Sequence, residues 1–136
     1  MVRSLLAVAL GYVVMLVAVV GGDMAFTALA PGLMPQPGEQ PDAVYFVFNL
    51  STGAFFMGIG AYVTALLAGH DEMKHALGLG ALSIAMSILS MILYPGEQPL
   101  WYSIALMFLS IPATLAGGWF RVRQLHEERA EAAASD

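Results

Sequence analysis

The chain has 136 residues, of which 59% are hydrophobic and only 11% are charged, and its formal net charge is −5 at pH 7. Soluble domains carry about 25% charged residues, so this composition excludes an ordinary soluble protein. The acidic balance argues against nucleic acid as a partner. Because the sequence has no cysteine, disulfides, thiolate metal sites, cysteine nucleophiles and covalent c-type haem attachment are excluded.

Four stretches of the sequence contain no Asp, Glu, Lys, Arg or His: 4–22, 43–69, 76–96 and 98–120. Each is long enough to cross a hydrocarbon core, which takes roughly 20 residues in a helix. The alternating pattern of a transmembrane β-barrel is absent. The sequence therefore predicts an all-α membrane protein with four transmembrane helices in an up-down bundle.

The predicted bundle is a single domain that occupies residues 1–136. We expect its helices at about 4–30, 43–69, 74–94 and 99–123. Residues 121–134 consist mostly of helix formers, so we expect the fourth helix to extend into a short cytoplasmic tail and fray in solvent.

The basic residues indicate the orientation. Arg3 precedes the first span, Lys74 lies between the second and third, and the three remaining arginines follow the fourth. The loops at 31–42 and 94–99 contain acidic residues but no Lys or Arg. Basic residues in short loops mark the cytoplasmic side, so both termini are predicted to be cytoplasmic.

The two loops on the side opposite the predicted cytoplasmic side share a five-residue motif. The sequence Pro-Gly-Glu-Gln-Pro occupies 37–41 and again 95–99. This repeat is consistent with two duplicated helical hairpins of the same orientation. Convergent use of turn-forming residues explains it equally well.

Small residues predict the packing faces, because helices in lipid associate through close backbone contacts and interhelical hydrogen bonds. In the third span, small side chains recur at steps of three and four and so share one stripe. The aromatic residues at the span ends, including Trp101 and Tyr102, are typical of interfacial anchors. The residues predicted to form helix contacts are Gly11, Gly58, Gly80, Ser83, Ser87 and Gly117.

Asp23 is the one acidic residue enclosed by apolar sequence. A carboxylate at that depth is costly unless it faces protein or water, and polar residues of the second and third spans should reach it. We therefore expect a polar cluster of Asp23, Asn49, Thr52 and Ser90. The carboxylate could be structural, could be linked to protons or cations, or could contact a partner protein.

His70 and His75 flank a charged segment between the second and third spans. Imidazole and carboxylate groups bind divalent ions, but a five-residue offset places the two rings on different faces of a helix. We predict no metal site and no cofactor. No acid–base or nucleophile–base pair stands at a usable spacing, so the sequence does not indicate an enzyme.

The segment Gly60-Ala61-Tyr62-Val63-Thr64-Ala65-Leu66-Leu67-Ala68-Gly69, followed by His75-Ala76-Leu77-Gly78-Leu79-Gly80, resembles a class of uncharacterised four-helix bacterial membrane proteins. The resemblance covers about 20 residues directly and implies a bacterial inner-membrane location and no known activity. The small multidrug-resistance transporters are also four-span chains with one membrane carboxylate. They differ because their glutamate lies deep in the first helix.

Two functions follow as hypotheses. The first is a non-enzymatic accessory or structural subunit in the lipid bilayer that packs against itself or against other membrane subunits. The alternative is a small proton- or cation-linked transporter or channel that uses Asp23.

Overall fold

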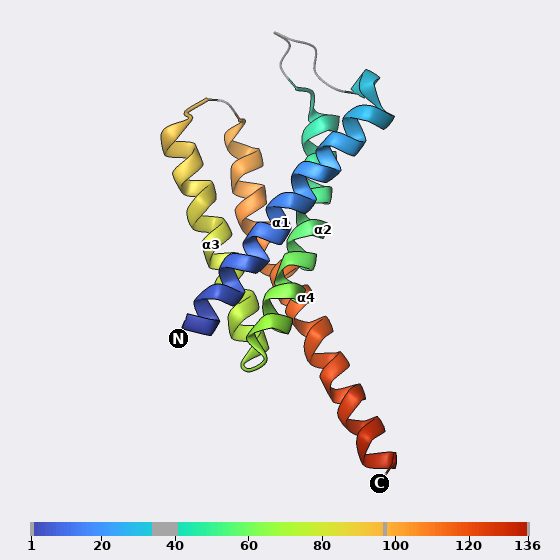
Figure 1. Ribbon diagram of the computed structural model, residues 1–136. Coiled ribbons are helices and arrows are strands. Elements are labelled where there is room, and N and C mark those ends of the chain that lie inside the picture. Colours follow the sequence, from blue (N-terminus) through green and yellow to red (C-terminus); the bar gives the residue numbers. More distant parts are fainter. Residues whose placement is uncertain (1, 34–40, 97, 136) are drawn as a thin grey trace.

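The computed structural model describes residues 2–33, 41–96 and 98–135. It contains four long helices, coloured along the sequence in Figure 1: α1 (Val2–Leu29), α2 (Ala43–Ala68), α3 (Glu72–Leu93) and α4 (Leu100–Ser135). A short 3-10 helix, η1 (Pro31–Leu33), follows α1, and the described residues form no strand. All four long helices are long and apolar enough to cross a membrane. The predicted all-α, up-down bundle is confirmed, and the chain is an integral membrane protein.

The ends of α2 have clear local causes. Asp42 is the N-cap, and its carboxylate accepts a hydrogen bond of 2.8 Å from the backbone N–H of Tyr45. At the other end Gly69 adopts a left-handed conformation (φ 68°), and its N–H donates to the carbonyl of Ala65. Glycine takes this conformation without steric cost, which is why it ends helices so often.

The fourth helix continues past the predicted span of 99–123 to Ser135, through the segment 121–134 that was expected to extend it. Good helix formers and an i,i+4 ion pair between Arg123 and Glu127 (2.9 Å) favour helix over this charged segment. Pro112 lies inside α4, where it removes one backbone hydrogen bond and bends the helix. The orange first half and the red second half of α4 differ in direction in Figure 1.

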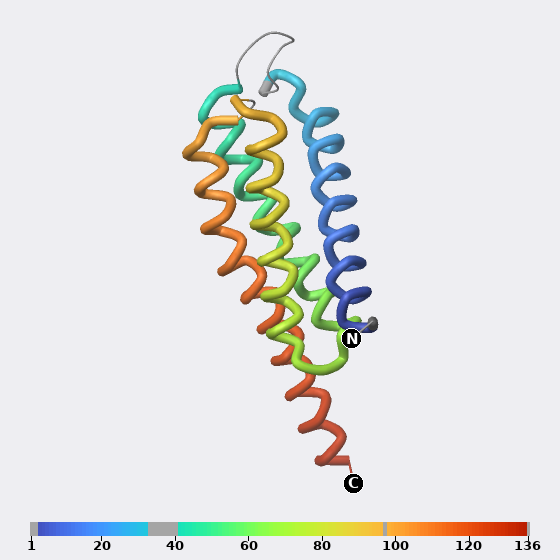
Figure 2. Tube along the Cα trace, turned by 90° about the vertical axis from the view of Figure 1, so that its left-hand side faces the viewer, coloured from blue at the N-terminus to red at the C-terminus, as the bar shows by residue number. Residues whose placement is uncertain are grey.

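The two ends of the bundle differ. The N-terminus, the α2–α3 turn and the second half of α4 lie toward one end, which we call the basic end because all five Lys and Arg residues belong to these segments. The α3–α4 turn lies at the other end, which we call the loop end (Figures 1 and 2). Helix α2 contacts the other three long helices, and α3 also contacts α1 and α4.

Glycines let the backbones of α2, α3 and α4 approach closely in the half of the bundle near the basic end. A Cβ on Gly117 of α4 would collide with the carbonyl oxygen of Gly58 on α2. A Cβ on Gly118 would lie 2.7 Å from the Cβ of Ala76 on α3. These positions leave no room for a side chain, so they set how closely α4 packs.

Helix α1 docks on α2 in the same way. A Cβ on Gly11 would collide with the hydroxyl of Thr64, and one on Gly60 would lie 2.8 Å from the Cβ of Met15. Gly80 of α3 adds a third contact of this kind, since its Cβ would lie 2.8 Å from the Oγ1 of Thr114 on α4. The half of the bundle near the basic end is therefore closed by direct backbone contact.

Replacing a contact glycine should separate two helices. We expect Gly117→Ala to lower the free energy of unfolding by about 1–3 kcal/mol, because the new methyl group meets backbone rather than a flexible side chain. Thermal unfolding in mild detergent measures the effect.

The matched control is Gly21→Ala, in α1, where a Cβ meets no atom within 4 Å. There the substitution should be neutral or stabilising by up to about 1 kcal/mol, because alanine has the higher helix propensity. Equal unfolding temperatures for both variants would show that Gly117 is not a packing residue.

Candidate functional site

Three polar side chains form a hydrogen-bonded chain across the bundle. Asn49 of α2 donates through Nδ2 to Oδ1 of Asp23 on α1, at 3.3 Å. The hydroxyl of Tyr102 on α4 donates to Oδ1 of the same asparagine. The amide of Asn49 thus uses its donor toward one helix and its acceptor toward another. We call these three residues the polar bridge.

Aromatic packing holds Tyr102 in position. Its ring lies 5.0 Å from the ring of Phe46, which itself contacts Trp101 at 5.8 Å. Tyr102 is 6% exposed, whereas Trp101 is 47% exposed. Trp101 therefore fits the predicted interfacial anchor. Tyr102, in contrast, points inward and completes the polar bridge. Its sequence neighbours gave no indication of this role.

Thr52 and Ser90, the other expected members of the cluster, form no hydrogen bond with the side chains of the bridge in the part of the chain that the structure describes. Thr52 donates to the carbonyls of Phe48 and Asn49 in its own helix, at 3.0 and 3.1 Å. Ser90 is exposed and lines a cavity. The structure therefore brings Asp23 and Asn49 together and replaces the two hydroxyl residues with Tyr102.

That cavity, of about 530 Å³, lies between the helices in the half near the loop end. Its lining runs from Tyr12, Met15 and Ser83 in the middle of the bundle to Pro95 and Gln98 at the α3–α4 turn. We call it the loop-end cavity. All four long helices contribute to its wall.

The small residues predicted to form the packing stripe of α3 lie in two different surroundings. Gly80 and Ser83 are buried in the closed half, and Ser83 donates to the sulfur of Met15 on α1 at 3.9 Å. Ser87 and Ser90 line the cavity. Ser87 is thus part of the cavity wall, and its predicted place in a helix contact stays a prediction.

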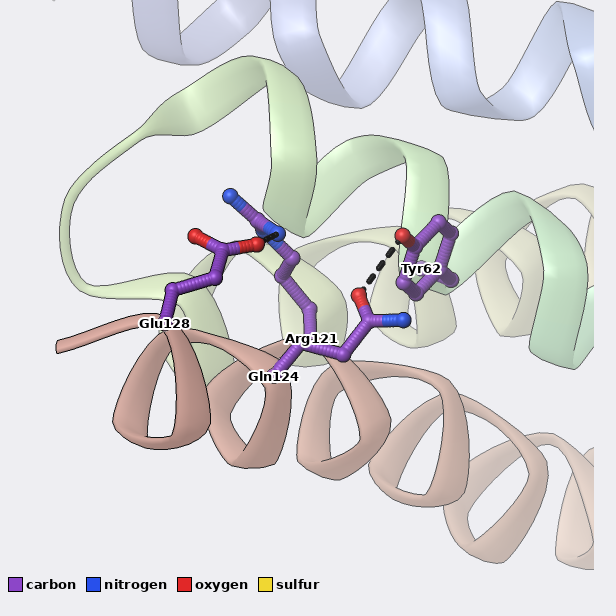
Figure 3. A network of polar contacts seen from close by, with 4 residues as sticks. All are labelled: Tyr62, Arg121, Gln124 and Glu128. Atoms are coloured by element: carbon purple, nitrogen blue, oxygen red, sulfur yellow. Dashed lines mark hydrogen bonds and ion pairs between the residues drawn. The ribbon is translucent and has the colours of Figure 1, made fainter. Parts of the chain in front are cut away.

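A second set of polar contacts lies where α4 leaves the bundle (Figure 3). The hydroxyl of Tyr62 on α2 donates to Oε1 of Gln124 at 2.8 Å, and Arg121 pairs with Glu128 at 3.3 Å. The side chain of Arg121 is only 16% exposed, while that of Glu128 is 61% exposed. Such a half-exposed pair contributes little stability, and both of its residues lie on α4. The Tyr62–Gln124 hydrogen bond is the contact of this set that joins α4 to α2.

At the same end, Arg3 donates from Nε to the carbonyl of Leu67 at 3.3 Å. A cation beside the last carbonyls of a helix is favourable, so this contact ties the start of α1 to the end of α2. The rings of His70 and His75 meet edge to face with their centroids 4.9 Å apart, and each contacts a backbone carbonyl through Nδ1. The described residues contain no group of three His, Cys, Asp or Glu placed to hold a metal ion.

Comparisons of the chain with protein-family models, with curated proteins and with solved structures gave no match.

The polar bridge should act as a unit. Tyr102→Phe removes one hydroxyl and should lower the free energy of unfolding by about 0.6–1.7 kcal/mol, the range for interhelical hydrogen bonds in membranes. Tyr94→Phe serves as the control, because Tyr94 is exposed and its hydroxyl bonds to no described residue.

A double-mutant cycle then tests the coupling. Once Asn49 is leucine, adding Tyr102→Phe should have almost no further effect, because the acceptor of the hydroxyl is already gone. Strictly additive effects of the two substitutions on thermal unfolding would disprove the bridge.

Proposed function

We propose that this chain is a non-enzymatic accessory subunit of a bacterial inner membrane, which packs against itself or against other membrane subunits. The observation that carries the proposal is the extension of α4 past the bundle at the basic end, seen in Figures 1 and 2. From His126 to Ser135 every side chain is exposed. An unsupported helical segment of this length is marginally stable in water, so contact with a second protein would stabilise it.

The charges of the extension suit a protein partner. It carries Arg123 and Glu127 as a pair and places acidic and basic side chains on the same short segment. Mixed charges of this kind steer association and set its register more than they add affinity. Nucleic acid is a poor candidate, since the chain as a whole is acidic.

The polar bridge supports a structural role for Asp23. Its carboxylate accepts from Asn49, which in turn accepts from Tyr102, so the hydrogen-bonded chain joins three helices. The buried hydroxyls nearer the basic end donate to carbonyls of their own helices, as Thr64 and Thr114 do at 2.9 and 2.8 Å. These bonds leave few polar groups free to pass an ion onward.

The alternative is a proton- or cation-linked transporter that works through Asp23. One observation favours it: Asn49, the partner of the carboxylate, also lines the loop-end cavity. Against it stand the glycine contacts that close the other half of the bundle. Transport would require these backbone contacts to open.

We further propose that the basic end faces the cytoplasm, so that both termini are cytoplasmic. The support is the placement of every Lys and Arg in segments at that end, as the bias toward positive cytoplasmic loops requires. The inner-membrane location rests on the resemblance of residues 60–69 and 75–80 to bacterial four-helix membrane proteins.

Removal of residues 125–135 tests the accessory role. This truncation keeps the Tyr62–Gln124 hydrogen bond, so the membrane bundle should stay folded, with an unchanged helical circular dichroism per residue. Native mass measurement after gentle extraction should show the full chain in a complex with itself or another subunit, and the truncated chain alone. A native mass that corresponds to a monomer of the full-length chain would contradict the proposal.

Cysteine labelling tests the orientation, and the natural sequence offers a cysteine-free background. Cysteine at Gln98, which is exposed in the α3–α4 turn, should react with a membrane-impermeant thiol reagent in cells whose outer membrane is permeable to it. Cysteine at Lys74, exposed near the α2–α3 turn, should react only after the membrane is opened. The reverse pattern would invert the topology.

A further inference from the structure

The loop-end cavity has the dimensions of a ligand site. Its volume of about 530 Å³ falls within the range of roughly 300–1,000 Å³ typical of small-molecule pockets. Along α3 its wall runs from Ser83 to Tyr94, which at 1.5 Å per residue is a depth of about 16 Å. Its lining extends from Pro95 and Gln98 at the α3–α4 turn to the middle of the bundle, where Met15 and Ser83 contact each other.

Hydroxyl groups in the cavity wall are available to a ligand. Elsewhere in the helices, hydroxyls such as those of Thr64, Ser110 and Thr114 donate to carbonyls four residues earlier. Those of Ser87 and Ser103, which line the cavity, form no hydrogen bond with any other described residue. Ser103 is also 5% exposed. The described residues contain no fully buried side-chain oxygen without a hydrogen-bond partner, so the Ser103 hydroxyl must be accessible from the cavity, where water or a ligand can bond to it.

The rest of the wall is apolar and adaptable. Four methionines of the described residues contribute to it: Met15, Met57, Met86 and Met91. Methionine has three rotatable bonds and a polarisable sulfur, and it suits surfaces that accept apolar groups of varied shape. Methionines beside free hydroxyls match an amphiphile, with an apolar body and a hydrogen-bonding head, better than a lipid tail, which offers nothing to the hydroxyls.

The charges around the cavity favour a ligand whose head group is positively charged. Among the described residues that line the cavity there is no Lys, Arg or His. Asn49 lines it and donates to the carboxylate of Asp23 directly behind. A positive group that binds beside Asn49 would lie within roughly 6 Å of that carboxylate, a separation at which opposite charges stabilise each other in a partly buried site.

We propose that the loop-end cavity binds a small organic cation with an apolar, aromatic-sized body, which enters from the loop end. The body lies among the methionines, and the amino groups of the head face Asn49 and the hydroxyls of Ser87 and Ser103. This site is separate from the α4 extension, so it does not depend on the accessory role. A test of one does not decide the other.

The test uses proflavine, a flat fluorescent cation with two amino groups, and acridine, which has the same rings, lacks the amino groups and is neutral at pH 7.5. The full-length protein is placed in nanodiscs of zwitterionic lipid, and fluorescence anisotropy is titrated against empty nanodiscs. We expect saturable binding of proflavine with an affinity at least tenfold higher than that of acridine. Equal affinities, or no binding above that of the empty nanodiscs, would overturn the proposal.

Two glycines provide matched variants for locating the site. Gly53 lines the cavity and Gly21 does not, and a Cβ at either position meets no atom within 4 Å. Gly53→Leu should fill the cavity and weaken proflavine binding at least tenfold, whereas Gly21→Leu should leave it unchanged. Both variants should keep the helical content and thermal stability of the wild type, so loss of fold is detected separately.

Asp23→Asn tests the charge, and it should weaken proflavine binding about tenfold while acridine binding stays the same. Unchanged proflavine binding in Gly53→Leu would exclude this cavity as the site. Native mass measurement tests whether a phospholipid occupies the cavity instead. One phospholipid bound to the wild type and absent from Gly53→Leu would make the cavity a lipid site and refute the cation proposal.

Discussion

The close approach of helix backbones at glycine is the constraint on which the rest of the structure depends. In a bilayer, helices gain little from burying apolar side chains against each other, so contact requires small residues. Here the contacts at Gly11, Gly80 and Gly117 all lie in the half of the bundle near the basic end. In the other half the helices leave the loop-end cavity between them. Direct side-chain bonds from Asp23 through Asn49 to Tyr102 connect the helices there.

The division into a closed half and an open half gives each end of the molecule a different chemistry. The closed half directs α4 away from the bundle, where Tyr62 and Gln124 fix its course and the charged extension begins. The open half offers free hydroxyls and methionines next to a carboxylate that is held by Asn49. We therefore propose contact with another protein at the basic end and contact with a small cation at the loop end.

Much of the fold follows from the sequence, because uncharged runs of sufficient length can be satisfied only as membrane helices. The contact of Asp23 with Asn49 could also be predicted, since depth along two antiparallel helices is set by residue count. Rotation about each helix axis is not set in this way. That is why Tyr102 was assigned to the interface although it is buried, and why the place of Ser87 in the cavity wall was not predicted. The duplication of a helical hairpin, suggested by the repeated Pro-Gly-Glu-Gln-Pro motif, stays a prediction, because most of the first copy of the motif lies outside the described residues.

The central claim is that Asp23 serves as a structural link across a bundle that is closed on one side, and does not carry an ion across the membrane. The most direct measurement is proton and cation flux in vesicles reconstituted with the wild type or with Asp23→Asn. The account predicts no flux above that of protein-free vesicles for either protein, and near-normal stability for Asp23→Asn, since asparagine keeps a hydrogen-bond acceptor for Asn49. A pH- or cation-driven flux in the wild type that disappears in Asp23→Asn would contradict it and establish the transporter.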